Sequence, residues 1–376
     1  MPAGAGVRRT AGCVAARARD WTRRVLTGKL PASFAKRMEA VMRIKLTLAL
    51  LAAASACEAA SRPLDIYFID VEGGQSTLLV TPDRQTLLID TGFAGNADRI
   101  VAAAHDAGVK QIDYLMTTHF HPDHDGGVVE LSKLLPIRHF IDHETLLPEA
   151  QKVADIKAAY ERYREVQKGH PHIVPKPGDR LPLTGIDVEV VSSAAAVLTK
   201  PLAGAGATNA LCGSGTVPPG DALENPRSTG VVVTLGKFRF LDVGDLTGQP
   251  LFDLACPKSL IGPVDVYLVA HHGGPDVAAP ALFAAFKPRV AIMNNGLKKG
   301  GAKTTYEALH HVDGLADVWQ VHKSASAAEQ NFSDDHIANL DESTVHWIKV
   351  SAHADGSFEV ANGRTGQRKT YPPSGD

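Results

Sequence analysis

The sequence predicts an α/β sandwich with mixed sheets, and two observations lead to this fold class. Short strands follow one another as a meander from residue 63 to residue 92. After the meander, helices alternate with single buried strands that end in polar residues. No linker is evident in the sequence after residue 62, so residues 61–376 are expected to form one domain.

The meander is indicated by runs of apolar residues and by the turn residues between them. A first strand reaches Val71, a glycine turn follows at Gly73–Gly74, and two further strands flank a turn at Pro82–Asp83. Residues 96–108 are typical of a helix, and Asn96 is expected to cap it.

The next elements alternate between strands and helices. Residues 111–119 predict a buried strand that runs directly into the cluster "HFHPDHDGG". In chain order, the pattern then predicts a short helix at 128–135, a strand at 137–143, a charged helical segment at 144–164 and a strand at 187–194. Residues from about 144 to 224 are interpreted as an insertion. A glycine-, alanine- and proline-rich stretch from Leu202 to Asn225 is expected to form a long loop at its end.

The C-terminal part repeats this alternation. Residues 230–246 predict a hairpin that turns at Gly236, and residues 264–274 predict a buried strand that ends in two histidines and two glycines. The remaining expected elements are a helix at 279–288, a strand at 289–295, a helix at 305–314 and a β-rich region that continues to Tyr371.

The composition is that of an ordinary globular protein. The chain has 376 residues, of which 44% are hydrophobic and 21% charged, and its formal net charge is -2. A charge this close to zero argues against a broad basic surface for duplex nucleic acid. It is compatible with a nucleic-acid substrate held locally by metal ions. The sequence gives no indication of the oligomeric state.

The first sixty residues suggest export. Residues 42–60 combine a short basic start, an apolar core and a small-residue end, which are the three parts of a signal peptide. Their apolar run is too short for a membrane span. A periplasmic or extracellular protein without a transmembrane span in its mature chain is therefore expected. Residues 1–41 are interpreted as a non-native extension, with a disordered basic extension as the alternative.

Two cysteine questions follow from the expected export. Lipid attachment at Cys57 is an alternative to simple secretion. In an oxidising compartment Cys212 and Cys256 could pair, or they could be two unrelated buried thiols. Their spacing does not decide between the two.

Four polar clusters stand at the ends of predicted strands. Imidazole and carboxylate groups together suit zinc, and also manganese or iron. Two histidines two residues apart, followed by an acid and a third histidine, can face two adjacent metals from one loop. A carboxylate from another strand would bridge these metals, and a polar network without metal is the alternative. The clusters are Asp90; His119, His121, Asp123 and His124; Asp242 and Asp245; and His271 and His272.

From Asp65 to Ser324 the chain resembles the metallo-β-lactamase superfamily. It is most similar to the hydrolase domain of competence-type DNA-uptake proteins, through "DVEGGQSTLLV", "LLIDTG", "NPRSTGVVVTLGKFRFLDVGD", "VAHHGG" and "KPRVAIMNNG". The resemblance implies a four-layer αββα sandwich with a dinuclear site along the sheet edges. It also implies a metal-dependent hydrolase with two divalent ions. Zinc is the expected metal, and manganese and iron are the alternatives.

The resemblance also implies a role for each residue of the clusters. His119 and His121 would hold metal one, Asp123 and His124 would hold metal two, and Asp245 would bridge them. One of His271 and His272 would complete metal two. We favour His271 as that ligand, with His272 as a catalytic candidate beside Asp123, which could orient the nucleophile. Asp90 would fix a histidine tautomer or support the loop, and Asp242 would be a neighbour of the site.

One departure from the superfamily pattern concerns metal one. Superfamily hydrolases usually offer another histidine just before the strand that leads to the bridging aspartate, and here Asn225 stands in that region. Metal one would then be weakly held, or His170 or His172 would supply the missing ligand, although we interpret these two as ordinary loop histidines. The leaving-group acid is open among His272, Lys298 and Lys299, and the lysines are expected to be solvated.

Three functions agree with these features. The first is hydrolysis of a phosphodiester, including nucleic acid, through a water that two metals activate. The second is hydrolysis of a lactone, a thioester or a β-lactam. The third is a non-catalytic binding protein on a degenerate metal site, for which Asn225 is the main argument. The expected partner is a small-molecule or phosphodiester substrate.

Overall fold

A computed structural model describes residues 62–213, 217 and 220–375, all within the compact unit Ser61–Asp376. The predicted extension at 1–41, the predicted signal peptide at 42–60 and Cys57 lie outside the described residues. None of the helices in the described part combines the length and apolar character that crossing a membrane requires.

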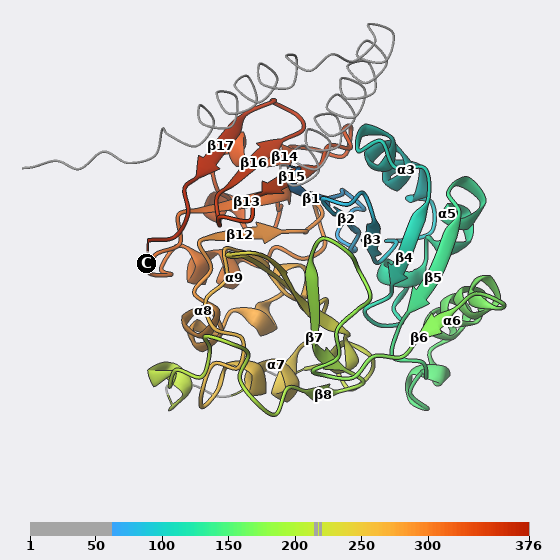
Figure 1. Cartoon of the computed structure of the whole chain (residues 1–376), viewed down its shortest axis with the longest axis horizontal. Coiled ribbons are helices and arrows are strands. Elements are labelled where there is room, and N and C mark those ends of the chain that lie inside the picture. Colours follow the sequence, from blue (N-terminus) through green and yellow to red (C-terminus); the bar gives the residue numbers. More distant parts are fainter. Residues whose placement is uncertain (1–61, 214–216, 218–219, 376) are drawn as a thin grey trace, which may run out of the picture. The chain divides into compact units, whose positions relative to one another are not determined.

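Within the described residues, the strands form two sheets (Figure 1). The nine-stranded sheet has the order β17-β16-β15-β1-β2-β3-β4-β5-β6. Its strands are β1 (Leu64–Phe68), β2 (Thr77–Val80), β3 (Thr86–Ile89), β4 (Ile112–Met116), β5 (Ile137–Ile141), β6 (His172–Ile173), β15 (Ile348–Ala352), β16 (Phe358–Asn362) and β17 (Arg368–Tyr371). Strands β1 to β3 pair antiparallel, as the predicted meander requires, and β3, β4, β5 and β6 pair parallel.

The eight-stranded sheet has the order β14-β13-β12-β11-β10-β9-β7-β8. Its strands are β7 (Asp187–Ser193), β8 (Ala196–Val197), β9 (Gly230–Leu235), β10 (Phe238–Asp242), β11 (Val266–Leu268), β12 (Val290–Met293), β13 (Asp317–His322) and β14 (Ile337–Asn339). The predicted hairpin at Gly236 is β9 and β10, and from β10 to β14 neighbouring strands pair parallel.

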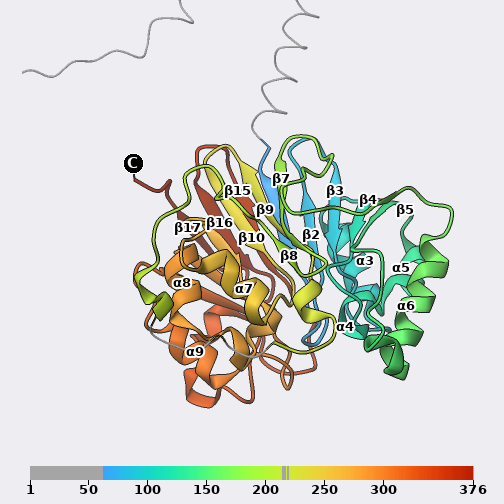
Figure 2. The same cartoon turned by 90° about the horizontal axis from the view of Figure 1, so that it is seen from below.

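Helices cover the outer face of each sheet (Figure 2). The helices over the nine-stranded sheet are α3 (Ala97–Asp106), α5 (Val128–Leu134) and α6 (Ala154–Gln167), and those over the eight-stranded sheet are α7 (Gly248–Ala255), α8 (Pro280–Phe286) and α9 (Lys303–Leu309). The short helix α4 (Pro122–Asp125) lies at the end of the segment after β4.

Three apolar layers hold these elements together. Alternate residues of a strand point to opposite faces, so each sheet contributes one set of side chains to the space between the sheets and another set to its helices. Phe68 of β1 and Phe240 of β10 meet between the sheets with ring centroids 5.7 Å apart. Tyr67 packs on the α3 side, and Leu241 packs on the α7 side. The predicted α/β sandwich with mixed sheets is therefore confirmed.

The structure differs from the expected elements in two places. Asn96 stands at the N-cap position of α3, but its side chain makes no capping hydrogen bond. Helix α6 begins at Ala154 rather than near Glu144. Glu144 has a φ of 74°, and Pro148 disfavours helical backbone at the residue before it, so the chain forms only a 3₁₀ turn at Ala150–Lys152 before α6.

The long loop after β8 is tied to a helix. Cys212 lies in a 3₁₀ turn at Ala210–Gly213 and forms a disulfide with Cys256, the residue after α7. The Cα atoms of the two cysteines are 5.6 Å apart. Of the two alternatives that the sequence left open, the structure has the paired one.

Candidate metal centre

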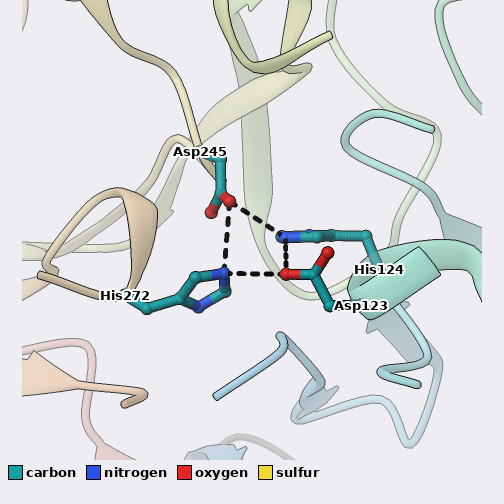
Figure 3. A group of neighbouring side chains, drawn as sticks. All are labelled: Asp123, His124, Asp245 and His272. Atoms are coloured by element: carbon teal, nitrogen blue, oxygen red, sulfur yellow. Dashed lines mark hydrogen bonds and ion pairs between the residues drawn. The ribbon is translucent and has the colours of Figure 1, made fainter. Parts of the chain in front are cut away.

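Four side chains converge where the ends of the two sheets meet (Figure 3). One ligand atom from each of Asp123, His124, Asp245 and His272 lies within 4.8 Å of the other three. The Asp245 Oδ2 atom is 3.2 Å from His124 Nε2 and 3.1 Å from His272 Nε2. The Asp123 Oδ2 atom is 3.4 Å and 3.2 Å from the same two nitrogens. We call these residues the four-residue group.

The donor atoms of the four-residue group fit a divalent metal ion. Two imidazole nitrogens and two carboxylate oxygens form a set that suits zinc, manganese or iron. All four residues are buried, and His272 Nε2, which faces both carboxylates, has no hydrogen-bond partner among the described residues. Buried polar atoms normally have partners, so this cluster is better explained by a bound cation than by internal hydrogen bonds.

Tight local backbone places these side chains. Asp123 and His124 lie in α4, which Pro122 begins with a φ that suits the first helical position. His271 and His272 form a 3₁₀ turn after β11, with φ values of 48° and 50°. Such values are unfavourable for residues other than glycine and persist where surrounding structure holds them.

The loop after β12 holds the His272 turn in place. The Gly301 N–H donates to the His272 carbonyl oxygen at 2.7 Å. A Cβ atom at Gly300 would lie 2.4 Å from that oxygen and 2.6 Å from the His272 Cβ, so this close approach requires glycine.

Asp90 contacts His124 at the ring nitrogen that faces away from Asp123 and Asp245. Its Oδ2 atom lies 2.7 Å from His124 Nδ1, and its two oxygens accept hydrogen bonds from the N–H and the hydroxyl of Thr118. A carboxylate at Nδ1 keeps the proton on that nitrogen, so that Nε2 is presented to Asp123 and Asp245.

The electrostatics of the four-residue group suit cation binding. Burial opposes ionisation of Asp245, but His272 and His124 hold the pKa of its carboxyl well below its ordinary value. Burial likewise disfavours a charged His124, yet Asp245, Asp123 and Asp90 hold its pKa well above the usual range. Without metal, a proton on His124 and the ammonium group of Lys299 face these carboxylates, and a metal ion would displace the proton on His124.

His119 and His121 lie beside this group and contact each other. His119 Nε2 is 2.9 Å from His121 Nδ1, and the His119 ring centroid is 4.1 Å from that of His124. Burial and the neighbouring His124 lower the pKa of His119 well below its ordinary value. When both imidazoles are neutral, only one proton can lie between these two facing nitrogens. The pair therefore has nitrogen lone pairs that a cation could use.

His271 lies outside the four-residue group. Its Nδ1 atom is 2.9 Å from both Asp276 carboxylate oxygens, and its Nε2 atom is 3.9 Å from Asp245 Oδ2. The sequence favoured His271 over His272 as the ligand, whereas the structure brings His272 to Asp123, His124 and Asp245. Consecutive residues of this turn point in different directions, with ring centroids 6.1 Å apart, and residue spacing alone could not show which one faces the group.

Asn225 occupies the region where a further histidine was expected. It begins a 3₁₀ turn before β9, its Nδ2 atom lies 3.3 Å from His271 Nε2, and its Oδ1 atom is buried without a hydrogen-bond partner among the described residues. His172 Nε2 is instead 2.9 Å from Asp142, and the His170 ring packs at a tilt against Phe140, with ring centroids 5.3 Å apart. Both histidines of the insertion thus have structural partners of their own.

The two lysines considered as leaving-group acids lie in different surroundings. Lys299, which we expected to be solvated, donates from Nζ to the Asp123 carboxylate and to the Gly73 carbonyl oxygen, the latter at 2.8 Å. Lys298 instead pairs with Glu342 on the surface. The contact of Lys299 depends on where the loop after β12 lies, and no sequence motif marks it.

Asp242 is a neighbour of the site with a hydrogen-bond network of its own. Its carboxylate accepts from Gln75 Nε2 at 3.1 Å and from the Gly244 N–H at 2.9 Å. Burial raises the pKa of Asp242 to about 7. Asp221 is a further acid near the site, and its charge acts on His121 and His271.

Comparisons with known proteins match one part of the chain to a protein family. Residues 70–202 match the model of the metallo-beta-lactamase superfamily, a stretch that includes His119 to His124 but ends before Asp245 and His272. A comparison with curated protein sequences gives no match.

Several solved structures are similar at low sequence identity. The metallo-beta-lactamase fold protein YhfI from Bacillus subtilis is 13% identical, with a TM-score of 0.42 over 69% of this chain and 96% of YhfI. A metallo-beta-lactamase with a HARLDQ motif from Cronobacter sakazakii is 18% identical, with a TM-score of 0.30 over 51% of this chain and 66% of its own. CmlA, a diiron beta-hydroxylase from Streptomyces venezuelae, is 13% identical, with a TM-score of 0.36 over 62% of this chain and 46% of CmlA. By sequence, therefore, the chain is similar to the metallo-beta-lactamase superfamily over residues 70–202, on a fold of two sheets with helices on their outer faces.

Proposed function

We propose that this protein is a metal-dependent hydrolase whose centre is the four-residue group. The observation that carries the proposal is the convergence of Asp123, His124, Asp245 and His272, buried and with atoms that lack other partners. These four residues would hold one divalent ion. His119 and His121 would hold a second, and Asp245 would supply negative charge to both.

The chemistry follows from this set of donors. When bound, two divalent ions lower the pKa of a water molecule so that a hydroxide nucleophile exists at neutral pH. Asp90 fixes the His124 tautomer. Asp123 can orient the nucleophile, because its carboxylate faces the centre of the four-residue group together with His272 Nε2. We propose zinc as the metal, with manganese or iron as alternatives for the same donors.

We infer a phosphodiester as the type of substrate. The resemblance to the competence-type hydrolase domain supports this inference, and so does Lys299, whose ammonium group lies at the Asp123 carboxylate, next to where a phosphate would be attacked. A lactone, a thioester or a β-lactam is the alternative class.

We also propose that the protein is exported. The disulfide between Cys212 and Cys256 supports this, because such bonds persist in oxidising compartments. The predicted signal peptide at 42–60 leads to the same proposal.

The test is cleavage of bis(p-nitrophenyl) phosphate by the zinc- or manganese-loaded protein. Asp245→Asn removes the charge that links the two histidines of the four-residue group, and we expect kcat to fall by a factor of about 100 or more. The control is Asp253→Asn, whose carboxylate accepts a hydrogen bond from Gln249 on the exposed face of α7. Metal binding without diester cleavage would favour the alternative class of substrate, a lactone, a thioester or a β-lactam. Absence of both would favour a binding protein.

A further inference from the structure

We propose that the cavity beside the four-residue group binds a second anionic group of the substrate, a carboxylate or a phosphate, away from the bond that is cleaved. The inference rests on the proposed function and specifies its substrate class. That substrate would be a small molecule with two functional groups. One is an anionic group that anchors the molecule, and the other is the ester that is hydrolysed.

The lining of the cavity carries this inference. The cavity has a volume of about 470 Å³, and its lining includes His271, His272, Lys299 and Lys303. The hydroxyl residues Thr304 and Ser326 also line it. None of the described residues that line the cavity is an aspartate or a glutamate. Basic and hydroxyl side chains around a concave space are the chemistry that recognises a carboxylate or a phosphate.

Lys303 is placed to bind an incoming anion. Its Nζ atom is 3.2 Å from Glu329 and 3.9 Å from Glu307, and its side chain is 49% exposed. Ion pairs this exposed contribute at most about 1 kcal/mol. The lysine can therefore exchange its glutamate partners for a substrate anion at little cost.

Lys299 connects this cavity to the metal centre. Its side chain lines the cavity, and its ammonium group contacts Asp123 of the four-residue group. His272 likewise lines the cavity and belongs to the four-residue group. A ligand held by Lys303 therefore lies beside the place where hydrolysis would occur, so the anchor and the scissile bond can belong to one small molecule.

The size of the cavity and the charge of the protein limit the substrate further. A volume near 470 Å³ falls within the range of small-molecule sites, which is about 300–1,000 Å³. The formal net charge of -2 supplies no long-range attraction for a long polyanion. Recognition of an anion must then come from the few lysines at this cavity.

The test compares Lys303→Gln with Lys298→Gln. Lys298 is a matched control because it is close in the chain and exposed, but it pairs with Glu342 and does not line the cavity. Binding of benzoate and of phenyl phosphate to the metal-free protein is followed by ligand-observed NMR, which is independent of turnover. We expect Lys303→Gln to weaken binding about three- to tenfold, the effect of one partly exposed charged contact, and Lys298→Gln to leave it unchanged. Stronger binding of phenyl phosphate than of benzoate would identify a phosphate anchor, and the reverse order a carboxylate anchor.

A second readout uses turnover by the metal-loaded protein. The substrates are bis(p-nitrophenyl) phosphate and two analogues in which one nitrophenyl group is replaced by a 4-carboxyphenyl or a 4-phosphooxyphenyl group. We expect the anionic analogues to have the higher kcat/KM, and Lys303→Gln to remove that advantage through KM. Equal binding of the anions by wild type, Lys298→Gln and Lys303→Gln would overturn the inference whether or not a diester is cleaved. Anion binding that depends on Lys303, in a protein that cleaves no diester, would support the anion site and contradict the proposed function instead.

Discussion

Asp90 is placed to orient His124, one residue of the four-residue group. The carboxylate is fully buried and makes three contacts, with His124 Nδ1, the Thr118 N–H and the Thr118 hydroxyl. Burial raises the pKa of Asp90, and its contacts with His124 and Thr118 oppose that rise. Its partners thus favour the charged form that orients His124.

Replacing Asp90 by asparagine should weaken the metal centre. The amide keeps the shape but can present an N–H to His124 Nδ1, which favours the wrong tautomer. We expect metal affinity to fall about 10- to 100-fold, as for other partners of ligating histidines. Competition with a zinc chelator measures this. The control is Asp65→Asn, which alters a half-buried carboxylate paired with Lys349 and Ser351. Unchanged affinity in Asp90→Asn would contradict the role of Asp90.

Asp242 should make stability depend on pH. Its folded-state pKa is about 7, above the ordinary value of 3.8 for the unfolded chain, because burial disfavours its charge. The folded state therefore binds this proton more tightly. The resulting stability is fully present below about pH 4 and is lost as the pH rises through 7.

Asp242→Asn should remove this pH dependence. Urea unfolding of the metal-free protein at pH 5 and pH 8 measures it. Relative to wild type, the variant should gain stability at pH 8 compared with pH 5, by up to about 3 kcal/mol since one pKa unit corresponds to about 1.4 kcal/mol. The Gly244 N–H keeps an acceptor in the variant. An identical pH profile in the two proteins would show that Asp242 is ionised throughout.

At the scale of elements, a buried carboxylate fixes the insertion helix to the sheet. Asp142 follows β5 and accepts hydrogen bonds from Tyr163 at 2.7 Å and from Gln167 at 2.9 Å, both on α6. His172 Nε2 lies 2.9 Å from the same carboxylate. The hydrogen bonds and the contact with His172 hold the pKa of Asp142 below its ordinary value despite burial. Helix α6 is thereby attached to the edge of the nine-stranded sheet.

Tyr163→Phe should loosen this attachment. Removing one donor from a buried carboxylate is expected to cost about 1–3 kcal/mol of unfolding free energy. Tyr160 offers a matched control on the same helix, because its hydroxyl donates to the Glu144 carbonyl oxygen at an exposed position. Tyr160→Phe should cost less. Equal losses in urea unfolding would mean that the Asp142 network does not hold α6.

The elements themselves could largely be predicted from the sequence. Strands such as β4 and helices such as α3 follow from local apolar patterns, and those patterns act over a few residues. The start of α6 could not be predicted in this way, because the charged pattern begins at Glu144 while Pro148 and a positive φ delay the helix. The Cys212–Cys256 bond also depends on how the long loop folds back to α7.

At the scale of the whole molecule, the four-residue group draws its side chains from segments that follow strands of both sheets. Asp123 and His124 follow β4 of the nine-stranded sheet, while Asp245 and His272 follow β10 and β11 of the eight-stranded sheet, and the four side chains meet (Figure 3). The sequence could predict the clusters, because each stands at the end of a recognisable strand. It could not predict which of His271 and His272 faces the group, or that Lys299 contacts Asp123, because both depend on how the loop after β12 packs on this edge.

The most direct test of this account is the metal content of three purified proteins. Wild type, His272→Ala and His271→Ala are loaded with zinc, desalted and measured by elemental analysis. The account predicts about two ions per chain in wild type, as in other two-metal hydrolases. It predicts loss of tightly held metal in His272→Ala and retention in His271→Ala, whose side chain is paired with Asp276. Retention in His272→Ala with loss in His271→Ala, or no metal in wild type, would contradict it.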